Sequence, residues 1–222
     1  MRIDIEQDMM AINNAYAADN RQLFHNSGTF AINIMGSPGA GKTTLLERTL
    51  HLLQNQLKVA VIEGDLATAK DAKRIASCGV AVVQINTDGG CHLDAKMISR
   101  VLPGFYVDSL DMLIIENVGN LVCPASFDLG EDLRIVVMSV TEGGDKPTKY
   151  PMSFMSADVV VLNKMDILEA SGMDIEETKN DLITINPQVK IFETCCRQGE
   201  VQGVDRLAEY LIAVSQAKKK RQ

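Results

Sequence analysis

Tryptophan is absent from this chain of 222 residues, aromatic residues make up only 5% of it, and it contains only three histidines. None of its five cysteines precedes Cys78. No apolar run approaches the roughly 20 residues that span a bilayer, which excludes a transmembrane helix. Residues 1–10 are acidic and lack the basic and apolar regions of a secretory signal. We therefore expect a cytoplasmic protein whose cysteines are reduced and unpaired.

Basic residues are also in the minority. The 22 lysines and arginines are outnumbered by 29 acidic residues, and the net charge of −7 argues against general binding to nucleic acid. The one basic run, Lys218 to Arg221, lies at the end of the chain, and we expect it to be a solvated, frayed tail. Internal repeats, low-complexity stretches and proline-rich linkers are missing as well. The sequence therefore predicts a single domain that binds neither nucleic acid nor membranes.

Apolar runs rich in Val and Ile recur along the chain and alternate with patterns typical of helices. Because these runs are continuous and do not alternate with polar residues, they predict buried strands of a mainly parallel sheet with helices on both faces. The sequence thus predicts a doubly wound α/β fold of about seven strands, with ligands at the carboxyl ends of the strands. The runs span residues 30–35, 57–62, 80–85, 111–118, 133–140, 158–162 and 189–194.

Residues 1–28, ahead of the first strand, predict a helical extension of a nucleotide-binding domain that spans residues 29–222. One stripe of this helix is apolar, whereas its other face carries Asp, Asn and Gln. We expect the apolar stripe to dock on the domain. The stripe consists of Ile5, Met9, Ile12, Tyr16 and Leu23.

The most informative motif runs from Gly36 to Thr43, where GSPGAGKT has the form GxxxxGK[ST]. It lies between a predicted strand and a predicted helix, the context in which backbone N–H groups and a helix N-terminus bind phosphates. We expect Lys42 to reach the β- and γ-phosphate oxygens and the Thr43 hydroxyl to face Mg²⁺. The motif predicts a P-loop nucleotide-hydrolysing protein. Its phosphate-binding residues are expected to be Gly36, Gly39, Ala40, Gly41, Lys42, Thr43 and Thr44.

The base is predicted from Asn163, Lys164 and Asp166, an NKxD pattern that directly follows a predicted strand. A carboxylate such as Asp166 can accept hydrogen bonds from the N1–H and the exocyclic amine of guanine, whereas adenine would leave it unpaired. The pattern therefore favours GTP and GDP over ATP. We expect the loop at residues 197–200 to cover the base through backbone contacts, with Arg197 as a further nucleotide-binding candidate.

Two acids lie at the ends of predicted strands. Asp65 follows the second strand and Glu116 lies in the fourth, and both positions let an acid approach Mg²⁺ or its waters. Turn or capping roles stay open for both residues. Gly119 suits a loop whose N–H meets the γ-phosphate, because glycine permits close approach of the backbone. Together with Lys42, these three residues are the catalytic candidates.

A second candidate site consists of Cys91, His92 and Cys123. Two thiols and an imidazole form a soft donor set suited to Zn²⁺ or Ni²⁺, and three protein ligands leave a position for water or for a group from a second subunit. The spacing alone is a weak signal, because free cysteines are often small buried hydrophobic residues and the pair lacks a CxxC signature. From these residues alone, both a metal site and a structural role stay open.

Taken together, these segments resemble HypB, the nickel-delivering GTPase of [NiFe]-hydrogenase maturation. The resemblance spans the chain from about Ile32 to Cys196. Its most specific part is ENVGNLVCP, which joins a γ-phosphate sensor to a metal ligand, and this favours the metal site. The segments that carry the resemblance are residues 36–43 (GSPGAGKT), 63–65 (EGD), 71–72 (DA), 91–94 (CHLD), 116–124 (ENVGNLVCP) and 163–166 (NKMD).

The resemblance implies Mg²⁺-dependent hydrolysis of GTP to GDP and phosphate, with Asp71 among the acids near the phosphates and Mg²⁺. It also implies a GTP-promoted homodimer with the Ni²⁺ or Zn²⁺ ligands at its interface and Lys149 near the partner's nucleotide. A hydrogenase maturation accessory protein and the hydrogenase large-subunit precursor are the implied further partners. Because no arginine finger is evident, slow turnover is expected. Unlike many HypB proteins, this chain has no N-terminal CxxCGC motif or histidine-rich stretch.

Two other functions stay open. A GTPase accessory protein for another nickel enzyme, of the urease type, typically carries a Cys-Pro-His motif, whereas Cys123 and Pro124 are followed here by Ala125. The other is a P-loop NTPase with structural cysteines, such as a partitioning-type ATPase. That class usually has a lysine near the start of its phosphate loop, where this chain has Ser37, and the NKxD pattern argues for guanine.

Overall fold

The computed structural model of the protein describes residues 5–65, 69–197 and 199–220. Within these residues, eight strands form one sheet in the order β3-β2-β4-β1-β5-β6-β7-β8. All neighbouring strands run parallel except β7 and β8, which are antiparallel. The strands are β1 (Phe30–Gly36), β2 (Val59–Asp65), β3 (Ala81–Asn86), β4 (Met112–Glu116), β5 (Leu133–Ser139), β6 (Val159–Asn163), β7 (Lys190–Arg197) and β8 (Glu200–Gln202).

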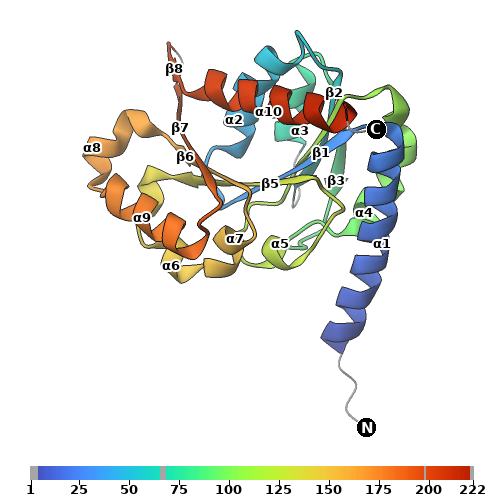
Figure 1. Ribbon diagram of the computed structural model, residues 1–222, viewed down its shortest axis with the longest axis horizontal. Coiled ribbons are helices and arrows are strands. Elements are labelled where there is room, and N and C mark those ends of the chain that lie inside the picture. The colour runs from blue at the N-terminus through green and yellow to red at the C-terminus, as the bar shows by residue number, and fades with distance from the viewer. Residues whose placement is uncertain (1–4, 66–68, 198, 221–222) are drawn as a thin grey trace.

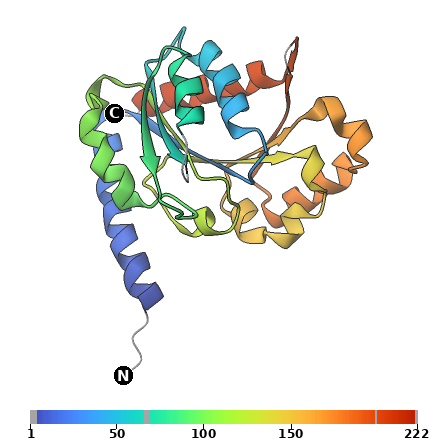
Figure 2. The same cartoon turned by 180° about the vertical axis from the view of Figure 1, so that it is seen from behind.

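Helices cover both faces of the sheet, so the prediction of a doubly wound, mainly parallel fold is confirmed (Figures 1 and 2). Helices α2, α3 and α10 pack on one face, and α1, α4, α7 and α9 contribute buried residues or packing contacts on the other. The α-helices are α1 (Ile5–Ser27), α2 (Lys42–Leu53), α3 (Lys70–Ala76), α4 (Ala95–Val101), α5 (Cys123–Ser126), α6 (Lys146–Lys149), α7 (Pro151–Met155), α8 (Leu168–Ser171), α9 (Ile175–Ile185) and α10 (Val204–Lys219), and the short 3₁₀ helices are η1 (Leu102–Gly104), η2 (Val107–Ser109), η3 (Val140–Glu142) and η4 (Met165–Ile167).

Central strand β1 shows why its sequence is apolar at nearly every position. Ile32 and Ile34 pack into the cluster beneath α2 and α10, whereas Ala31 packs toward α1 and α4 and Met35 toward α7 and α9. Both faces are therefore buried, as the continuous apolar runs predict. The edge of the sheet departs from this pattern, because β3 has only one neighbouring strand and is partly exposed along its length. The three-residue strand β8 was not predicted.

The docking face predicted for α1 is wrong. Met9 and Ile12 are 54% and 56% exposed, whereas Asn13 and Asn20 are 4% and 2% exposed. Ala17 and Phe24 complete the buried stripe. Figures 1 and 2 show α1 beside α4, with its N-terminal end extending away from the sheet. Asn13 and Asn20 form hydrogen bonds with backbone groups of Ala95, Asp128 and Leu129, which Met and Ile side chains could not do. No helix of the described residues, α1 included, is long and apolar enough to cross a bilayer.

The C-terminal basic run is not the solvated tail that its composition predicts. Lys218 Nζ donates to the carbonyl oxygen of Thr29 and pairs with Asp132, both at 2.7 Å. Lys219 pairs with Asp111. These lysines attach the end of α10 to the end of the sheet at which β1, β4 and β5 begin. Carboxylates in the loops that precede β4 and β5 neutralise their charges. Arg221 lies outside the described residues.

Candidate functional site

A pocket of about 530 Å³ opens beside the carboxyl ends of β2 and β4 and the start of α2. Most of the predicted nucleotide and Mg²⁺ residues lie in its wall, although they come from distant parts of the sequence. Gly36, the last residue of β1, and Ala40 belong to the phosphate loop but do not line the pocket. The predicted residues that line the pocket are Gly39, Gly41, Lys42, Thr43, Thr44, Asp65, Asp71, Glu116, Gly119 and Lys164.

The phosphate loop is shaped by close backbone packing. Gly41 caps α2 in the left-handed region with φ 93°, a conformation that favours glycine. A side chain at Gly36 would place its Cβ 2.4 Å from the carbonyl oxygen of Val137 on β5, so only glycine fits there. Lys42, the first residue of α2, is buried and its Nζ donates to the Gly36 carbonyl at 3.2 Å. Burial lowers the pKa of Lys42, while Glu116 and Glu63 act in the opposite direction.

The NKxD segment is fastened to this loop. Asn163 Nδ2 donates to the Ala40 carbonyl at 3.0 Å, and its Oδ1 accepts from the Thr194 hydroxyl at 3.0 Å. Lys164, which has a positive φ of 65°, donates from Nζ to the Gly39 carbonyl at 2.7 Å. Two of the three predicted base-recognition residues therefore also support the phosphate loop.

Besides Gly36, Ala40 and Asn163, two predicted nucleotide residues, Asp166 and Arg197, lie outside the pocket wall among the described residues. Asp166 is exposed in η4, one turn after Lys164. Arg197 is exposed at the end of β7 and pairs through its backbone with Glu200 of β8. Asp166 thus follows the carboxyl end of β6, and Arg197 is the last residue of β7. Gln198 of the predicted covering loop lies outside the described residues.

The pocket contains two buried carboxylates that face each other across neighbouring strands. Glu116 of β4 is paired in register with Glu63 of β2. Glu116 Oε1 accepts from the Thr43 hydroxyl at 2.7 Å, and the Oε2 atoms of both acids are buried without a hydrogen-bond partner. Burial raises the pKa of Glu116 to about 7; for Glu63, burial and then the charge of Glu116 raise the pKa to about 8. Unpaired carboxylate oxygens beside a threonine hydroxyl fit a hard divalent cation such as Mg²⁺.

Sequence reasoning missed two charged residues of this pocket, Glu63 and Arg74. Glu63 lies two residues before Asp65 at the same strand end, and that position was the available signal. Arg74 of α3 donates to Asp71 and to the Thr44 hydroxyl, both at 3.0 Å, and its Nη2 pairs with Glu47 at 2.7 Å. Its spacing of three residues from Asp71 on a helix was the signal. These ion pairs hold the guanidinium against the wall of the pocket.

Glu63→Gln is expected to flatten the pH dependence of stability of the nucleotide-free and Mg²⁺-free protein. A carboxyl whose folded pKa is raised from 4.5 to about 8 stabilises the fold fully below pH 4.5, and this stabilisation is lost as the pH rises to about 8. We expect the variant to be more stable than the wild type by about 1–3 kcal/mol at pH 8.5 and nearly equal to it at pH 4.5. Urea unfolding at the two pH values measures this, with the exposed Glu169→Gln as control. Parallel pH profiles for wild type and Glu63→Gln contradict it.

The three predicted soft ligands come together beside the pocket. One ligand atom from each of Cys91, His92 and Cys123 lies within 4.8 Å of the others, and Cys91 Sγ is 3.5 Å from His92 Nδ1. Cys91 is exposed, and Cys123 begins α5. The His92 ring stacks on Phe127 with 3.9 Å between ring centroids. Burial lowers the pKa of His92, which favours the neutral imidazole that binds metals. The arrangement suits a tetrahedral or similar thiolate site with one open position.

Two asparagines connect this cluster to the nucleotide pocket. Asn120 forms a backbone bridge with Gly36 and donates from Nδ2 to the Cys91 carbonyl at 3.1 Å. Asn117 Oδ1 accepts from the Leu93 N–H at 3.0 Å. Between them, a Cβ at Gly119 would lie 3.2 Å from Pro38 of the phosphate loop. The segment that begins at Glu116 therefore contacts both the phosphate loop and the chain that carries Cys91 and His92.

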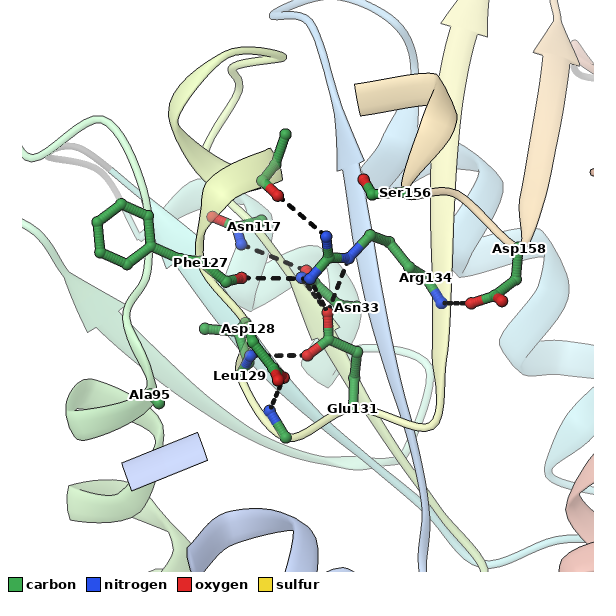
Figure 3. A network of polar contacts seen from close by, with 12 residues as sticks. Asn33, Ala95, Asn117, Phe127, Asp128, Leu129, Glu131, Arg134, Ser156 and Asp158 are labelled. Atoms are coloured by element: carbon green, nitrogen blue, oxygen red, sulfur yellow. Dashed lines mark hydrogen bonds and ion pairs between the residues drawn. The ribbon is translucent and has the colours of Figure 1, made fainter. Parts of the chain in front are cut away.

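A partly buried ion pair between Arg134 and Glu131 fixes the chain that follows Cys123 (Figure 3). Arg134 pairs with Glu131 at 2.6 Å and directs its remaining donors to the carbonyl oxygens of Ala125 and Phe127. Glu131 Oε2 in turn accepts from the Leu129 N–H at 2.7 Å. Arg134 and Glu131 thus fix the path of the chain between Cys123 and Leu129, including the ring that stacks on His92.

The fold and the site define a P-loop nucleotide-binding protein with a cysteine and histidine cluster beside its phosphate pocket. Residues 30–193 match the family described as CobW/HypB/UreG, nucleotide-binding domain. The chain is 48% identical over 203 residues to hydrogenase maturation factor HypB of Azotobacter chroococcum, covering 90% of this chain and 66% of that protein. It is 41% identical over 202 residues to the hydrogenase/urease maturation factor HypB of Helicobacter hepaticus, covering 89% of this chain and 83% of that protein.

A solved structure agrees with these relatives. The crystal structure of HypB from Helicobacter pylori in complex with nickel superimposes with a TM-score of 0.85 at 37% identity, covering 92% of this chain and 95% of that chain. The chain belongs to the HypB family. It spans 66% of the length of the Azotobacter chroococcum relative.

Proposed function

We propose that this protein is a GTP-hydrolysing metallochaperone that binds nickel or zinc and delivers nickel during [NiFe]-hydrogenase maturation. The observation that carries this proposal is the short segment from Glu116 to Cys123, which begins at a buried carboxylate of the nucleotide pocket and ends at a ligand of the soft cluster. The similarity to hydrogenase maturation factors, one of them crystallised with nickel, supports it.

In this proposal the phosphate loop and Lys42 bind the β- and γ-phosphates of GTP. Thr43 and Glu116 hold Mg²⁺, with Asp65 and Asp71 close to it or to its waters. Bound Mg²⁺ neutralises charge that develops on the phosphates during hydrolysis. Asn163 and Lys164 fasten the base side to the loop, while Asp166 recognises guanine and Arg197 covers it. The close approach of Gly119 to Pro38 suits an N–H that senses the γ-phosphate.

Nickel is the cargo in this proposal, and hydrolysis controls its release. Loss of the γ-phosphate frees the segment around Gly119, and Cys123 lies four residues further along the chain. Asn120 transmits the same movement to the carbonyl of Cys91. Both sides of the soft cluster thus respond to the nucleotide.

The proposal includes a GTP-promoted homodimer. A three-ligand cluster with an exposed cysteine leaves a position that a second copy can complete. Lys149, exposed on α6, is then expected near the partner's nucleotide. Residues 29–222 form the GTPase domain and residues 1–28 its helical extension. The hydrogenase large-subunit precursor and an accessory maturation protein receive or supply the metal.

The test is a titration of the reduced protein with Ni²⁺ and Zn²⁺ in GDP and in a non-hydrolysable GTP analogue, with its mass in solution measured in parallel. We expect the analogue to promote dimerisation and to change Ni²⁺ affinity, and Cys123→Ala to abolish that change and weaken Ni²⁺ binding. Cys78→Ala, at a cysteine remote from the cluster, is the matched control. If metal affinity is the same with GDP and with the analogue, and the same in Cys123→Ala as in wild type, the proposal is wrong and the protein is a GTPase with structural cysteines.

A second candidate function is metal delivery to urease. It is favoured by the similarity to the Helicobacter hepaticus protein named a hydrogenase/urease maturation factor. The same cluster and nucleotide pocket would serve this role. The two candidate functions differ only in the enzyme that receives the metal. Activation of apo-hydrogenase precursor and apo-urease by the nickel-loaded protein separates the two.

A further inference from the structure

The face of helix α1 that docks on the domain contains two buried amides beside the buried Ala17 and Phe24. Asn13 and Asn20 are 4% and 2% exposed, and their separation of seven residues places them on one face of the helix, about 10 Å apart along its axis. Burying an amide is unfavourable unless its donors and acceptor find partners. Ala17 and Phe24 already supply apolar burial along this stripe, so docking alone does not require asparagine at either position.

The partners of these amides are main-chain groups of the same two segments. Asn13 accepts from the Ala95 N–H at 2.9 Å and donates to the Asp128 carbonyl at 2.9 Å. Asn20 donates to the Ala95 carbonyl at 2.9 Å and to the Leu129 carbonyl at 3.0 Å. Each asparagine therefore bridges the start of α4 to the loop that precedes β5.

Both segments continue directly into the soft cluster. Ala95 lies three residues after His92, and Asp128 follows Phe127, whose ring stacks on His92. In Figure 3, Asp128 and Leu129 lie on the same stretch of chain as Phe127, next to Glu131 and Arg134. Helix α1 thus holds the two chain segments that continue from His92 and from Phe127.

Two further contacts hold α1 against the second segment. Arg21 donates to both carboxylate oxygens of Asp128, each at 2.7 Å. Gly130 has a φ of +90°, and a Cβ there would lie 2.6 Å from the Ala17 carbonyl of α1. The backbone of the loop therefore touches the backbone of the helix, with no side chain between them.

We infer that α1 is a clamp that sets the geometry of the metal site, with Asn13 and Asn20 as its positioning residues. The inference rests on the proposed function only in that Cys91, His92 and Cys123 bind the metal. The amides fix the spacing between the chain of His92 and the chain of Phe127 and Cys123. A movement of α1 changes that spacing, whereas none of the hydrogen bonds of Asn13 and Asn20 goes to the phosphate loop.

The test compares Asn13→Ala, Asn20→Ala and the double variant with wild type, using the full chain under reducing conditions and Ni²⁺ as the probe. Groups that orient metal ligands typically contribute about 10- to 100-fold in affinity. We expect a loss of Ni²⁺ affinity in that range, with a shift in the thiolate-to-nickel absorption band. GDP affinity, measured without metal, should change by less than about 2-fold, because the hydrogen bonds of Asn13 and Asn20 go to Ala95, Asp128 and Leu129 and none goes to the phosphate loop. Asn14→Ala, at the exposed neighbouring position, is the matched control.

Two more variants keep the test decisive if Asn20→Ala does not fold. Asn13→Asp keeps the acceptor for the Ala95 N–H but places a buried carboxylate oxygen against the Asp128 carbonyl, so a loss of Ni²⁺ affinity at least as large as that of Asn13→Ala is expected. Arg21→Ala removes a surface contact of the same clamp, and a smaller loss in the same direction is expected. Circular dichroism and GDP binding verify that each variant is folded before metal is added.

The outcomes separate the clamp from the proposed function. If wild type gives no thiolate-to-nickel band, the metal site itself is wrong. If wild type gives the band and both Asn13→Ala and Asn13→Asp match Asn14→Ala in affinity and spectrum, the clamp is overturned while the metal site stands. Equal losses of Ni²⁺ and GDP affinity identify a general structural role for α1 and also overturn the clamp.

Discussion

Lys42→Ala is expected to slow GTP hydrolysis by about 100- to 1,000-fold, the range for removing one donor that stabilises charge in the transition state. Lys42 is buried at the start of α2, and its ammonium is fixed by the Gly36 carbonyl at 3.2 Å. The charge is therefore held where the β- and γ-phosphates are expected, and it needs little reorganisation to stabilise them. Alanine removes the ammonium with the rest of the side chain beyond Cβ, whereas the backbone N–H groups of the loop remain.

Phosphate release in a single turnover, with enzyme in excess over GTP, measures this effect without interference from product release. The exposed Lys58→Ala is the control for loss of one positive charge and should hydrolyse GTP at the wild-type rate. A Lys42→Ala variant that is folded, saturated with GTP and as fast as wild type would exclude Lys42 from the hydrolysis step.

Asp166→Asn is expected to convert guanine preference into xanthine preference. Guanine presents an N1–H and an exocyclic amine, both donors, to the carboxylate. Xanthine presents the N1–H donor and a carbonyl acceptor, which match the acceptor and donor of the amide side chain. With guanine, the amide keeps an acceptor for the N1–H but turns its own donor toward the exocyclic amine, and the charge is lost from both contacts. This corresponds to about 3–5 kcal/mol, or about 100- to 10,000-fold weaker GDP binding.

Competition of GDP and XDP against a fluorescent guanine nucleotide measures the switch directly. Glu169→Gln, an exposed acid in the following helix α8, is the control and should leave the preference for GDP intact. Asp166 is exposed in η4, so its replacement is not expected to affect folding. If the folded Asp166→Asn protein keeps wild-type GDP affinity and ignores XDP, the base is recognised by other groups, and the guanine assignment loses its main support.

The phosphate loop and the strands could be predicted because their signals are local. Gly36 and Gly41 occupy backbone positions that exclude or disfavour other residues, and neighbouring apolar runs report burial on both sides of the sheet. The soft cluster was harder to predict. Cys91 follows β3 and Cys123 follows β4, and β2 lies between these strands in the sheet. Spacing in the sequence does not reveal that the two loops bend toward each other.

The errors have a common cause in long-range polar contacts. Asn13 contacts Asp128 over 115 positions, and Lys218 contacts Asp132 over 86. Periodicity reports how apolar a helix face is, but it does not report whether an opposing loop offers carbonyl groups or carboxylates. The buried face of α1 and the anchored end of α10 were therefore both misjudged.

By itself, the sequence determined the doubly wound class of the fold, the phosphate loop and the candidate ligands for base and metal, because glycine conformation, apolar runs and donor chemistry are properties of neighbouring residues. Only the tertiary structure decided that Glu63 faces Glu116, that Arg74 is paired against the pocket wall, and that α1 holds the chain on either side of the soft cluster. These are contacts between groups far apart in sequence, and a buried polar group is stable only where the folded chain brings it a partner.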